Sequence, residues 1–363
     1  MRGGEKVLLS LARLFPDAPI FTLLHIRGSV APELEARDIR TTFVQHLPAV
    51  DTHYRRYLPL FPAAAASMDL SGFDLVVSSS HCVAKGVRVP PGARHLCYCH
   101  TPMRYVWDRY DDYFGPERVS GAAAVALPVV AEALRAWDVA TAGGVERYVA
   151  NSAHVAGRIR RYYGRDAVVI PPPVDTDFFT PDDRPPGDYD LVVSALVPYK
   201  RIELILDAYR GGARRLKVVG GGPDAQHLRA VAGRQTELLG PVDDEALREL
   251  YRGCRAVIMA SVEDFGIVPL EAMACGRPAV VFAEGGGRET VLPGQTGVLF
   301  HEARTAALRA AVDSLEGLRF NTAALRAHAE AHSRQVFEAR FRAFVEEALA
   351  AEPASVRGDP IPW

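Results

Sequence analysis

The strongest constraint on the fold is a regular alternation of short apolar runs and helical segments across the second half of the chain. The apolar runs, which indicate buried strands, are 191–196, 216–220, 255–260 and 278–283. The segments with helical periodicity between them are 201–209, one that ends near 231, 243–252 and 267–275. Strands and helices that alternate in this way are typical of right-handed βαβ units, with a parallel sheet covered by helices on both faces. The second half is therefore predicted to be a Rossmann-like domain.

The first half alternates less regularly. Its expected strands are 19–24, 73–77, 94–98 and 147–150, and a helix is expected over 121–141. Proline-rich turns at 171–173 and 185–187 bracket a domain junction. A chain of 363 residues, 48% of them hydrophobic, has room for two cores. We predict an α/β chain with an N-terminal domain over 1–170, a C-terminal domain over 171–335, and a final helix and tail over 336–363. Packing of that helix back onto the N-terminal domain is one arrangement left open.

Charge and cysteine usage exclude several classes of protein. The formal net charge is −2, so the chain lacks the basic excess of a general nucleic-acid binder. The five cysteines show no metal-ligand spacing and fit a reducing compartment. No signal peptide is evident, and the apolar runs are shorter than the roughly 20 residues that span a bilayer. We therefore expect a cytoplasmic protein, with peripheral contact at the inner face of the cell membrane left open.

Two glutamates eight residues apart, Glu263 and Glu271, flank the start of a predicted helix. Glu263 follows the strand over 255–260, at the carboxyl edge of the sheet, where ligands of open α/β sheets bind. Pro269 fits the first turn of a helix and Gly276 fits the position just past its end. Backbone N–H groups at such a helix start attract phosphate. Those groups belong to Gly266, Ile267 and Val268. Taken alone, each glutamate is better explained as a solvated loop or helix acid.

Three further segments contain candidate site residues. Lys200 and Arg201 lie in the strand-to-helix turn that opens the second domain, where a cation can reach a diphosphate, although a solvated pair is the alternative. His100 ends a strand of the first domain, and a lone histidine in such a place is usually structural. Gly3 and Gly4 form a glycine pair at the beginning of the sequence.

These segments together resemble family 4 of the glycosyltransferases, which have the GT-B architecture of two facing Rossmann-like domains. The E-x7-E string from Glu263 to Glu271 and the glycine loop over 285–287 carry the resemblance, which extends from Gly3 to about Leu349. The chain is most similar to bacterial mannosyltransferases that build O-antigen or exopolysaccharide. Two features depart from the family. Ala195 stands where the family usually has an arginine, and the first strand of the N-terminal domain, which normally precedes the glycine pair, is missing.

The resemblance implies a role for each candidate residue. Lys200, Arg201 and the helix start at Gly266, Ile267 and Val268 would meet the diphosphate of a nucleotide-sugar. Glu263 would hold a hydroxyl of the donor sugar, Glu271 the ribose hydroxyls, and His100 would lie beside the sugar. Gly3 and Gly4 match the N-terminal glycine loop of the donor site. Val242 lies in a segment that resembles the loop under the base, although a plain turn with a helix cap at Asp243 explains it equally well.

The implied activity is transfer of a hexose, with mannose favoured, and with retention of anomeric configuration. The donor would be a nucleotide-diphospho-sugar, GDP-mannose favoured, with no cofactor and no metal, since no Asp-x-Asp motif is evident at a suitable strand end. The acceptor would be a saccharide or a polyprenyl-diphosphate-linked saccharide. The basic stretch over 158–163 is either a solvated helix face or a contact for such an acceptor or for anionic lipid.

Two other readings compete with this one. A non-catalytic or truncated homologue that keeps nucleotide binding is suggested by the missing first strand. A nicotinamide-dependent oxidoreductase would also have Rossmann-like domains, but the sequence lacks the GxGxxG fingerprint with its later acidic residue.

Overall fold

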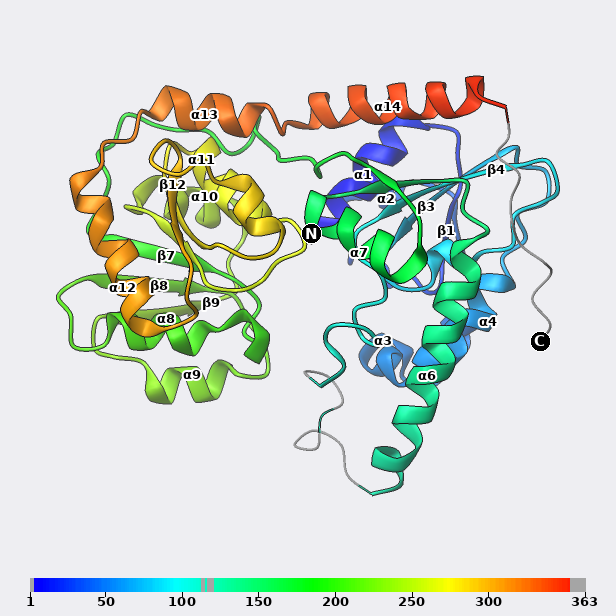
Figure 1. Ribbon diagram of the computed structural model, residues 1–363, viewed down its shortest axis with the longest axis horizontal. Coiled ribbons are helices and arrows are strands. Elements are labelled where there is room, and N and C mark those ends of the chain that lie inside the picture. The colour runs from blue at the N-terminus through cyan, green and yellow to red at the C-terminus, as the bar shows by residue number, and fades with distance from the viewer. Residues whose placement is uncertain (1–2, 112–114, 116–120, 353–363) are drawn as a thin grey trace. The chain divides into compact units, whose positions relative to one another are not determined.

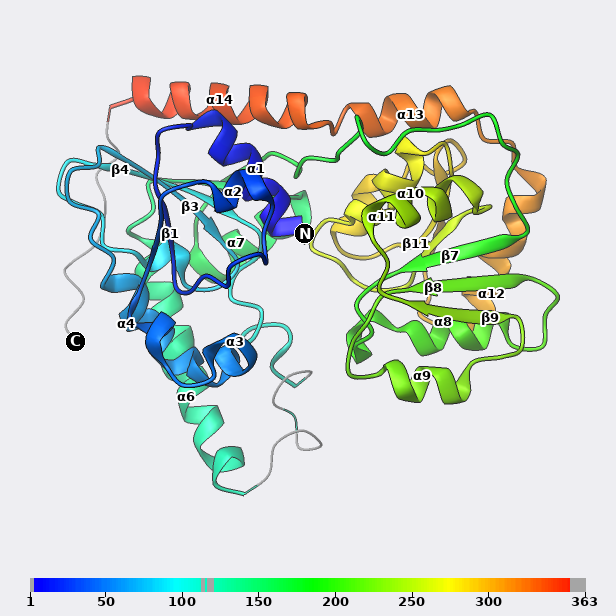
Figure 2. The same cartoon turned by 180° about the vertical axis from the view of Figure 1, so that it is seen from behind.

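The computed structural model describes residues 3–111, 115 and 121–352, and the chain divides into two compact units. The first unit comprises Met1–Pro172 and Phe337–Trp363, and the second comprises Pro173–Val336. Each unit contains a parallel sheet with helices on its faces (Figures 1 and 2). The predicted α/β chain of two domains with parallel sheets is confirmed. The predicted tail lies, over 353–363, outside the described residues.

In the second unit, whose residues are all described, six parallel strands run in the order β12-β11-β10-β7-β8-β9. The strands are β7 (Tyr189–Val193), β8 (Arg215–Val219), β9 (Thr236–Gly240), β10 (Val257–Met259), β11 (Ala279–Phe282) and β12 (Gly297–Phe300). The chain first builds β7, β8 and β9 in one direction and then returns to add β10 on the other side of β7. The order therefore reverses between β7 and β10, and the loops that leave these two strands diverge there.

Helices cover both faces of this sheet, which explains why its central strands β10 and β11 are apolar throughout. The helices are α8 (Ile202–Tyr209), α9 (Ala225–Val231), α10 (Asp244–Gly253), α11 (Ile267–Ala274), α12 (Thr305–Ser314) and α13 (Thr322–Glu330), with short 3-10 turns η4 (Pro198–Lys200), η5 (Gly286–Thr290) and η6 (Leu315–Gly317). Tyr251, Leu270 and Leu325 pack in one cluster and Ile205 and Leu308 in another. All residues of β10 and β11 are buried.

In the described part of the first unit, four parallel strands run in the order β3-β4-β5-β6, and β1 pairs with β2 separately. The strands are β1 (Ile20–Thr22), β2 (Ile39–Thr41), β3 (Leu75–Ser80), β4 (Arg94–Cys99), β5 (Arg147–Ala150) and β6 (Ala167–Val169). Side chains of β4 alternate between the two faces of the sheet. Leu96 and Tyr98 pack with Phe341 of α14 (Arg334–Ala350), whereas Cys97 and Cys99 pack in the cluster that contains residues of α7 (Ala153–Tyr163).

The remaining elements of the first unit surround this sheet. They are α1 (Gly3–Leu14), α2 (Pro32–Glu35), η1 (Phe43–His46), α3 (Val50–His53), η2 (Tyr54–Leu60), α4 (Phe61–Ala66), η3 (Ala84–Gly86) and α6 (Ala122–Ala142). Gly3 and Gly4 are the first two residues of α1, so their predicted placement in a loop is wrong. No strand precedes α1 among the described residues. None of the described helices has the length and apolar character needed to cross a membrane.

Candidate active site

The loops that leave β7 and β10 bring Lys200 and Glu263 together. Lys200 ends the turn after β7 and Glu263 follows β10, the neighbouring strand in the sheet. The Lys200 ammonium donates hydrogen bonds to both carboxylate oxygens of Glu263, at 2.6 Å to Oε1 and 2.7 Å to Oε2. Their side chains are 16% and 18% exposed. A cation and an anion that are only partly accessible to water thus meet at the point where the strand order reverses.

The glycine loop over 285–287 contacts the backbone around Glu263. The Gly286 N–H donates to the Glu263 carbonyl at 2.7 Å, and Ser261 donates its hydroxyl to Glu263 Oε1. A methyl group at Gly286 would lie 2.1 Å from the Asp264 carbonyl oxygen, so only glycine allows the two loops to approach this closely. The loop therefore fixes the backbone that carries Glu263.

Helix α11 begins directly after the loop that carries Glu263. Its first position is Ile267, and Gly266 precedes it with φ 107°, in the left-handed region that favours glycine. Gly266 has no side chain with which to cap the helix, so Gly266, Ile267 and Val268 present a start of the kind that binds anions. Glu271 lies one turn into α11, is 4% exposed, and accepts a hydrogen bond from the Tyr251 hydroxyl at 2.9 Å on Oε2.

Arg201 and Val242 take less direct positions. The guanidinium of Arg201 lies over the Phe282 ring, 4.9 Å from its centroid, and donates to the Ala260 carbonyl at 3.4 Å. Its backbone has φ 53°, at the junction of the η4 turn and α8. Val242 packs against the apolar cluster of the second unit, and the next residue, Asp243, caps α10 by accepting the Ala246 N–H at 2.8 Å. The structure thus shows the helix cap that was one of the two explanations for this loop.

In the first unit, the strand β4 ends just before His100. Its Nε2 lies 2.8 Å from the Ser79 hydroxyl, and its ring lies 5.0 Å from the ring of Tyr98. The Cβ position of Gly4 lies 3.7 Å from the imidazole, so the first turn of α1 packs beside it. Burial, together with the charges of His81 and Arg104, lowers the pKa of His100 to about 3. His100 is therefore a neutral imidazole at physiological pH.

Two residues of this arrangement were not predicted. Ser261 precedes Glu263 by two residues. A hydroxyl so close to a candidate acid in the sequence could have indicated this contact. Tyr251 lies 20 residues before Glu271, and an aromatic residue on the apolar side of an amphipathic helix gives no sign of such a contact. Within the described residues, no group of three or more His, Cys, Asp and Glu side chains is arranged to hold a metal ion.

The basic stretch of α7 is only partly available to a ligand. Arg158 forms an ion pair with Asp108 and donates a hydrogen bond to the Thr101 hydroxyl at 2.6 Å. Arg160 donates a hydrogen bond to the Asp166 carboxylate at 3.0 Å. Arg161 is exposed and lies over the ring of Tyr162, 5.4 Å from the centroid. Neither a plain solvated face nor a uniform cationic patch describes this helix.

Comparison with known proteins finds relatives among the glycosyltransferases. The chain is 36% identical over 256 residues to a D-inositol 3-phosphate glycosyltransferase of Geodermatophilus obscurus, covering 59% of this chain and 56% of the relative. It is 33% identical over 221 residues to a GDP-mannose-dependent alpha-(1-6)-phosphatidylinositol monomannoside mannosyltransferase of Mycolicibacterium smegmatis, covering 52% of this chain and 56% of the relative. The chain thus spans about half the length of the relatives it matches.

Solved structures share the fold. Sucrose-phosphate synthase from Thermosynechococcus elongatus has a TM-score of 0.71 at 19% identity, over 95% of this chain and 92% of that chain. Anabaena HepE in complex with UDP and glucose has a TM-score of 0.68 at 16% identity, over 95% and 96%. The fold is therefore GT-B. A family model described as "Glycosyltransferase Family 4" matches residues 1–178, and one described as "Glycosyl transferases group 1" matches residues 179–334. Because these two matches together extend from residue 1 to residue 334, the chain belongs to the family 4 glycosyltransferases.

Proposed function

We propose that this protein transfers a hexose from a nucleotide-diphospho-sugar to a saccharide acceptor, with retention of anomeric configuration and without a metal ion. The observation that carries the proposal is the contact between Lys200 and Glu263 beside the start of α11. In a nucleotide-sugar, the transferred sugar is bonded directly to the terminal phosphate. Groups that hold the phosphate and the sugar must therefore be neighbours, as Lys200 and Glu263 are.

The chemical problem is the negative charge that grows on the diphosphate as its bond to the sugar breaks. In the proposed mechanism the ammonium of Lys200 and the N–H groups of Gly266, Ile267 and Val268 stabilise that charge as it develops. Glu263 accepts a hydrogen bond from a sugar hydroxyl, held in orientation by Ser261. The acceptor attacks on the face that the diphosphate leaves, and the departing phosphate oxygen takes the acceptor proton.

The roles of the other candidates differ in their support. Neutral His100 can donate or accept a hydrogen bond with a sugar hydroxyl, and Gly4 leaves space beside it. In the proposal Arg201 contributes positive charge near the diphosphate, although its side chain packs on Phe282. Gly3 and Val242 remain proposed contacts of the donor. Mannose and a GDP donor are favoured because the Mycolicibacterium relative is named a GDP-mannose-dependent mannosyltransferase.

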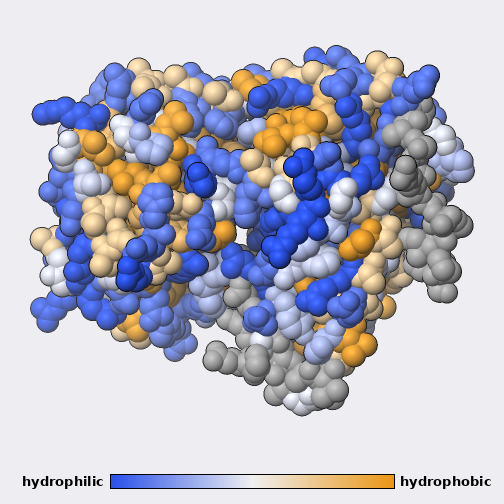
Figure 3. All heavy atoms as spheres, viewed as in Figure 1, coloured by the Kyte–Doolittle hydropathy of each residue, from blue (hydrophilic) through white to orange (hydrophobic). Residues whose placement is uncertain are grey.

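A lipid-linked acceptor and peripheral membrane contact are part of the proposal. A hollow of about 720 Å³ lies between α6 and α7 in the first unit. It is lined by Trp107, Glu132, Arg135, Ala136, Val139, Ala140, Arg161 and Tyr162. Figure 3 shows hydrophobic residues, in tan and orange, along the segment labelled α6 in Figure 1. Arginines beside apolar helix residues suit an anionic, lipid-linked molecule.

The test is a transfer assay with radiolabelled GDP-, UDP- and ADP-sugars. We expect one of these donors to be consumed, with EDTA leaving the rate unchanged and with NMR of the product showing the anomeric configuration of the donor. Glu263→Gln should lower turnover by roughly 10²–10³-fold with little change in donor affinity. Glu237→Gln is the matched control, since Glu237 is an exposed acid of the same unit, 3.9 Å from a lysine. Inversion, strict dependence on a divalent ion, or full activity of Glu263→Gln would each refute the corresponding part of the proposal.

A further inference from the structure

The contact between Tyr251 and Glu271 carries an inference that rests on the proposed function and on the ribose contact that the family resemblance implies for Glu271. The Tyr251 hydroxyl donates to Glu271 Oε2 at 2.9 Å, and the two side chains are almost completely buried. We propose that Tyr251 is a positioning residue, which holds the Glu271 carboxylate in the orientation that binds the ribose hydroxyls of the donor. Tyr251 would thereby determine how strongly the protein distinguishes a ribonucleotide from a deoxyribonucleotide.

The hydrogen bond limits the movement of the carboxylate. The terminal torsion of a glutamate is broad, so a carboxylate without a fixed partner samples many orientations. A bond from Tyr251 to one oxygen sets the plane of the group, and adjacent ribose hydroxyls need acceptors at fixed positions. Burial and the charge of Glu271 raise the pKa of Tyr251 well above its ordinary value, so the hydroxyl keeps its proton and remains a donor. Glu271 is then the acceptor in this bond, as it must be toward ribose.

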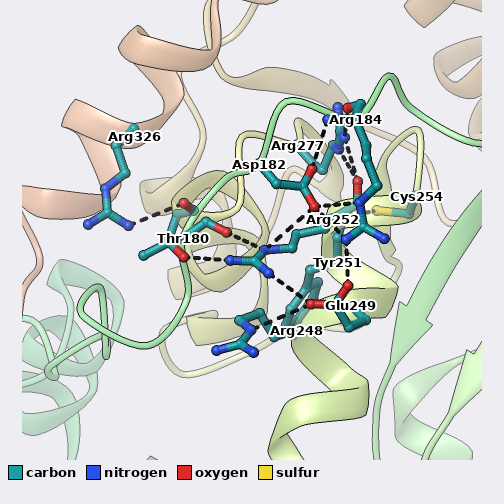
Figure 4. A network of polar contacts seen from close by, with 11 residues as sticks. Thr180, Asp182, Arg184, Arg248, Glu249, Tyr251, Arg252, Cys254, Arg277 and Arg326 are labelled. Carbon is teal, nitrogen blue, oxygen red and sulfur yellow. Dashed lines mark hydrogen bonds and ion pairs between the residues drawn. The ribbon is translucent and has the colours of Figure 1, made fainter.

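Tyr251 is itself held in place by a network at the end of α10 (Figure 4). Arg252 donates to the Thr180 carbonyl and to the Thr180 hydroxyl, each at 2.7 Å. Arg277 donates to the Arg252 carbonyl at 2.8 Å. The Tyr251 ring meets the Phe179 ring edge to face, with centroids 5.5 Å apart. These contacts fix the rotation of the last turn of α10, so the hydroxyl reaches Glu271 in one defined geometry.

The same unit contains a matched buried pair that serves a different purpose. The Tyr209 hydroxyl donates to Asp190 Oδ2 at 2.7 Å, and both residues are buried. Asp190 is also paired with Arg255, at 3.0 Å, so this carboxylate is already neutralised within the protein. Tyr209→Phe and Tyr251→Phe therefore each remove a tyrosine hydroxyl that donates to a buried carboxylate. Tyr209 lies away from the candidate site and Tyr251 lies within it.

The experiment measures binding of GDP, UDP and ADP, and of their 2′-deoxy and 3′-deoxy forms, by calorimetry. For the nucleotide that binds most tightly, the wild type should prefer ribose over at least one deoxy form by about tenfold or more, since a hydrogen bond to a charged group is involved. Tyr251→Phe should reduce this preference by about threefold or more and should raise the donor KM more than it lowers kcat. Tyr209→Phe should keep the wild-type preference, with both variants folded by circular dichroism.

The outcomes separate this inference from the proposed function. Loss of the ribose preference in Glu271→Ala together with its full retention in Tyr251→Phe would overturn the positioning role and leave the proposed function standing. An equal loss in Tyr251→Phe and Tyr209→Phe would show a general loosening of the domain and would also overturn it. Absence of any ribose preference in a wild type that transfers sugar would remove the role of Glu271 and the inference with it, but not the transferase activity.

Discussion

The structure sets a range for the coupling energy between Lys200 and Glu263, which a double-mutant cycle measures. Exposed ion pairs contribute about 0–1 kcal/mol, whereas removal of one partner of a buried pair costs about 3–5 kcal/mol. Lys200 and Glu263 are 16% and 18% exposed, and the lysine bonds both carboxylate oxygens. We therefore expect a coupling energy of roughly 1–3 kcal/mol between Lys200→Met and Glu263→Gln in a double-mutant cycle.

The assay can isolate the second unit because that unit contains no tryptophan. All three tryptophans, Trp107, Trp137 and Trp363, belong to the first unit, so tryptophan fluorescence follows unfolding there. Urea unfolding is followed by far-UV circular dichroism for the whole chain and by fluorescence for the first unit, and the substitutions should leave the fluorescence transition unchanged. Lys217 and Glu237, whose side chains are 23% and 56% exposed and whose charged atoms are 3.9 Å apart, supply a control cycle with coupling below about 0.5 kcal/mol.

A nucleoside diphosphate adds a functional arm to the same cycle. Its negative charges compete with Glu263 for the single ammonium of Lys200, so the measured coupling should shrink when the nucleotide saturates the protein. High salt should weaken the control pair proportionally more than the Lys200 pair, which is less accessible to ions. A coupling of the Lys200 pair that is indistinguishable from zero would refute the reasoning from its geometry. A coupling that the nucleotide leaves unchanged would refute the assignment of Lys200 to the diphosphate.

Three further predictions concern stability. Burial lowers the pKa of His95 to about 4, so between about pH 6.5 and 4 the unfolded chain binds a proton that the folded chain does not. The free energy of unfolding of the first unit should therefore decrease by about 3 kcal/mol over this range through His95. His95→Gln should flatten this pH dependence in urea titrations followed by fluorescence. Lys85→Met should cost roughly 3–5 kcal/mol in the same assay, because Asp138, which is fully buried 3.0 Å away, keeps a charge without its cation. Gly286→Ala should cost about 1–3 kcal/mol by circular dichroism and weaken nucleotide binding, since its methyl group would displace the Asp264 carbonyl.

Each of these has an outcome that contradicts it. An unchanged pH slope in His95→Gln would show that its proton affinity is similar in the folded and unfolded chain. If the unpaired charge of Asp138 causes the loss, adding Asp138→Asn to Lys85→Met should restore full stability. Failure to restore it would point to packing instead. A Gly286→Ala variant with wild-type stability would mean that the two loops separate without cost.

The central strands could be predicted because each is a short apolar run, and β5 has the predicted bounds, 147–150. The strands β2, β6 and β12, each three or four residues long, were not predicted. For the candidate site, the residues could be chosen from the sequence but their contacts could not. Lys200 and Glu263 are 63 residues apart, and they meet because β10 returns to the side of β7, an order that local patterns do not specify.

Other features depend on side-chain geometry in three dimensions. Arg201 is adjacent to Lys200 in sequence, yet its left-handed backbone conformation accompanies a side chain that packs on Phe282. Tyr251 looks like an ordinary core aromatic residue, because its hydroxyl partner comes from another helix, α11. In both cases the direction of a side chain decides which groups it contacts, and this direction depends on packing between elements.

The return of the chain to the first unit at Phe337 has a consequence for how the protein is made. The core around β4 contains Val7 and Leu11 from α1, together with Phe337 and Phe341 from α14. During synthesis, the second unit is complete as a continuous segment once Val336 has left the ribosome, whereas the first unit still lacks a wall of its core. We expect the later-made unit to reach its native state first. The earlier-made unit would then stay exposed to chaperones and proteases until the last helix closes it.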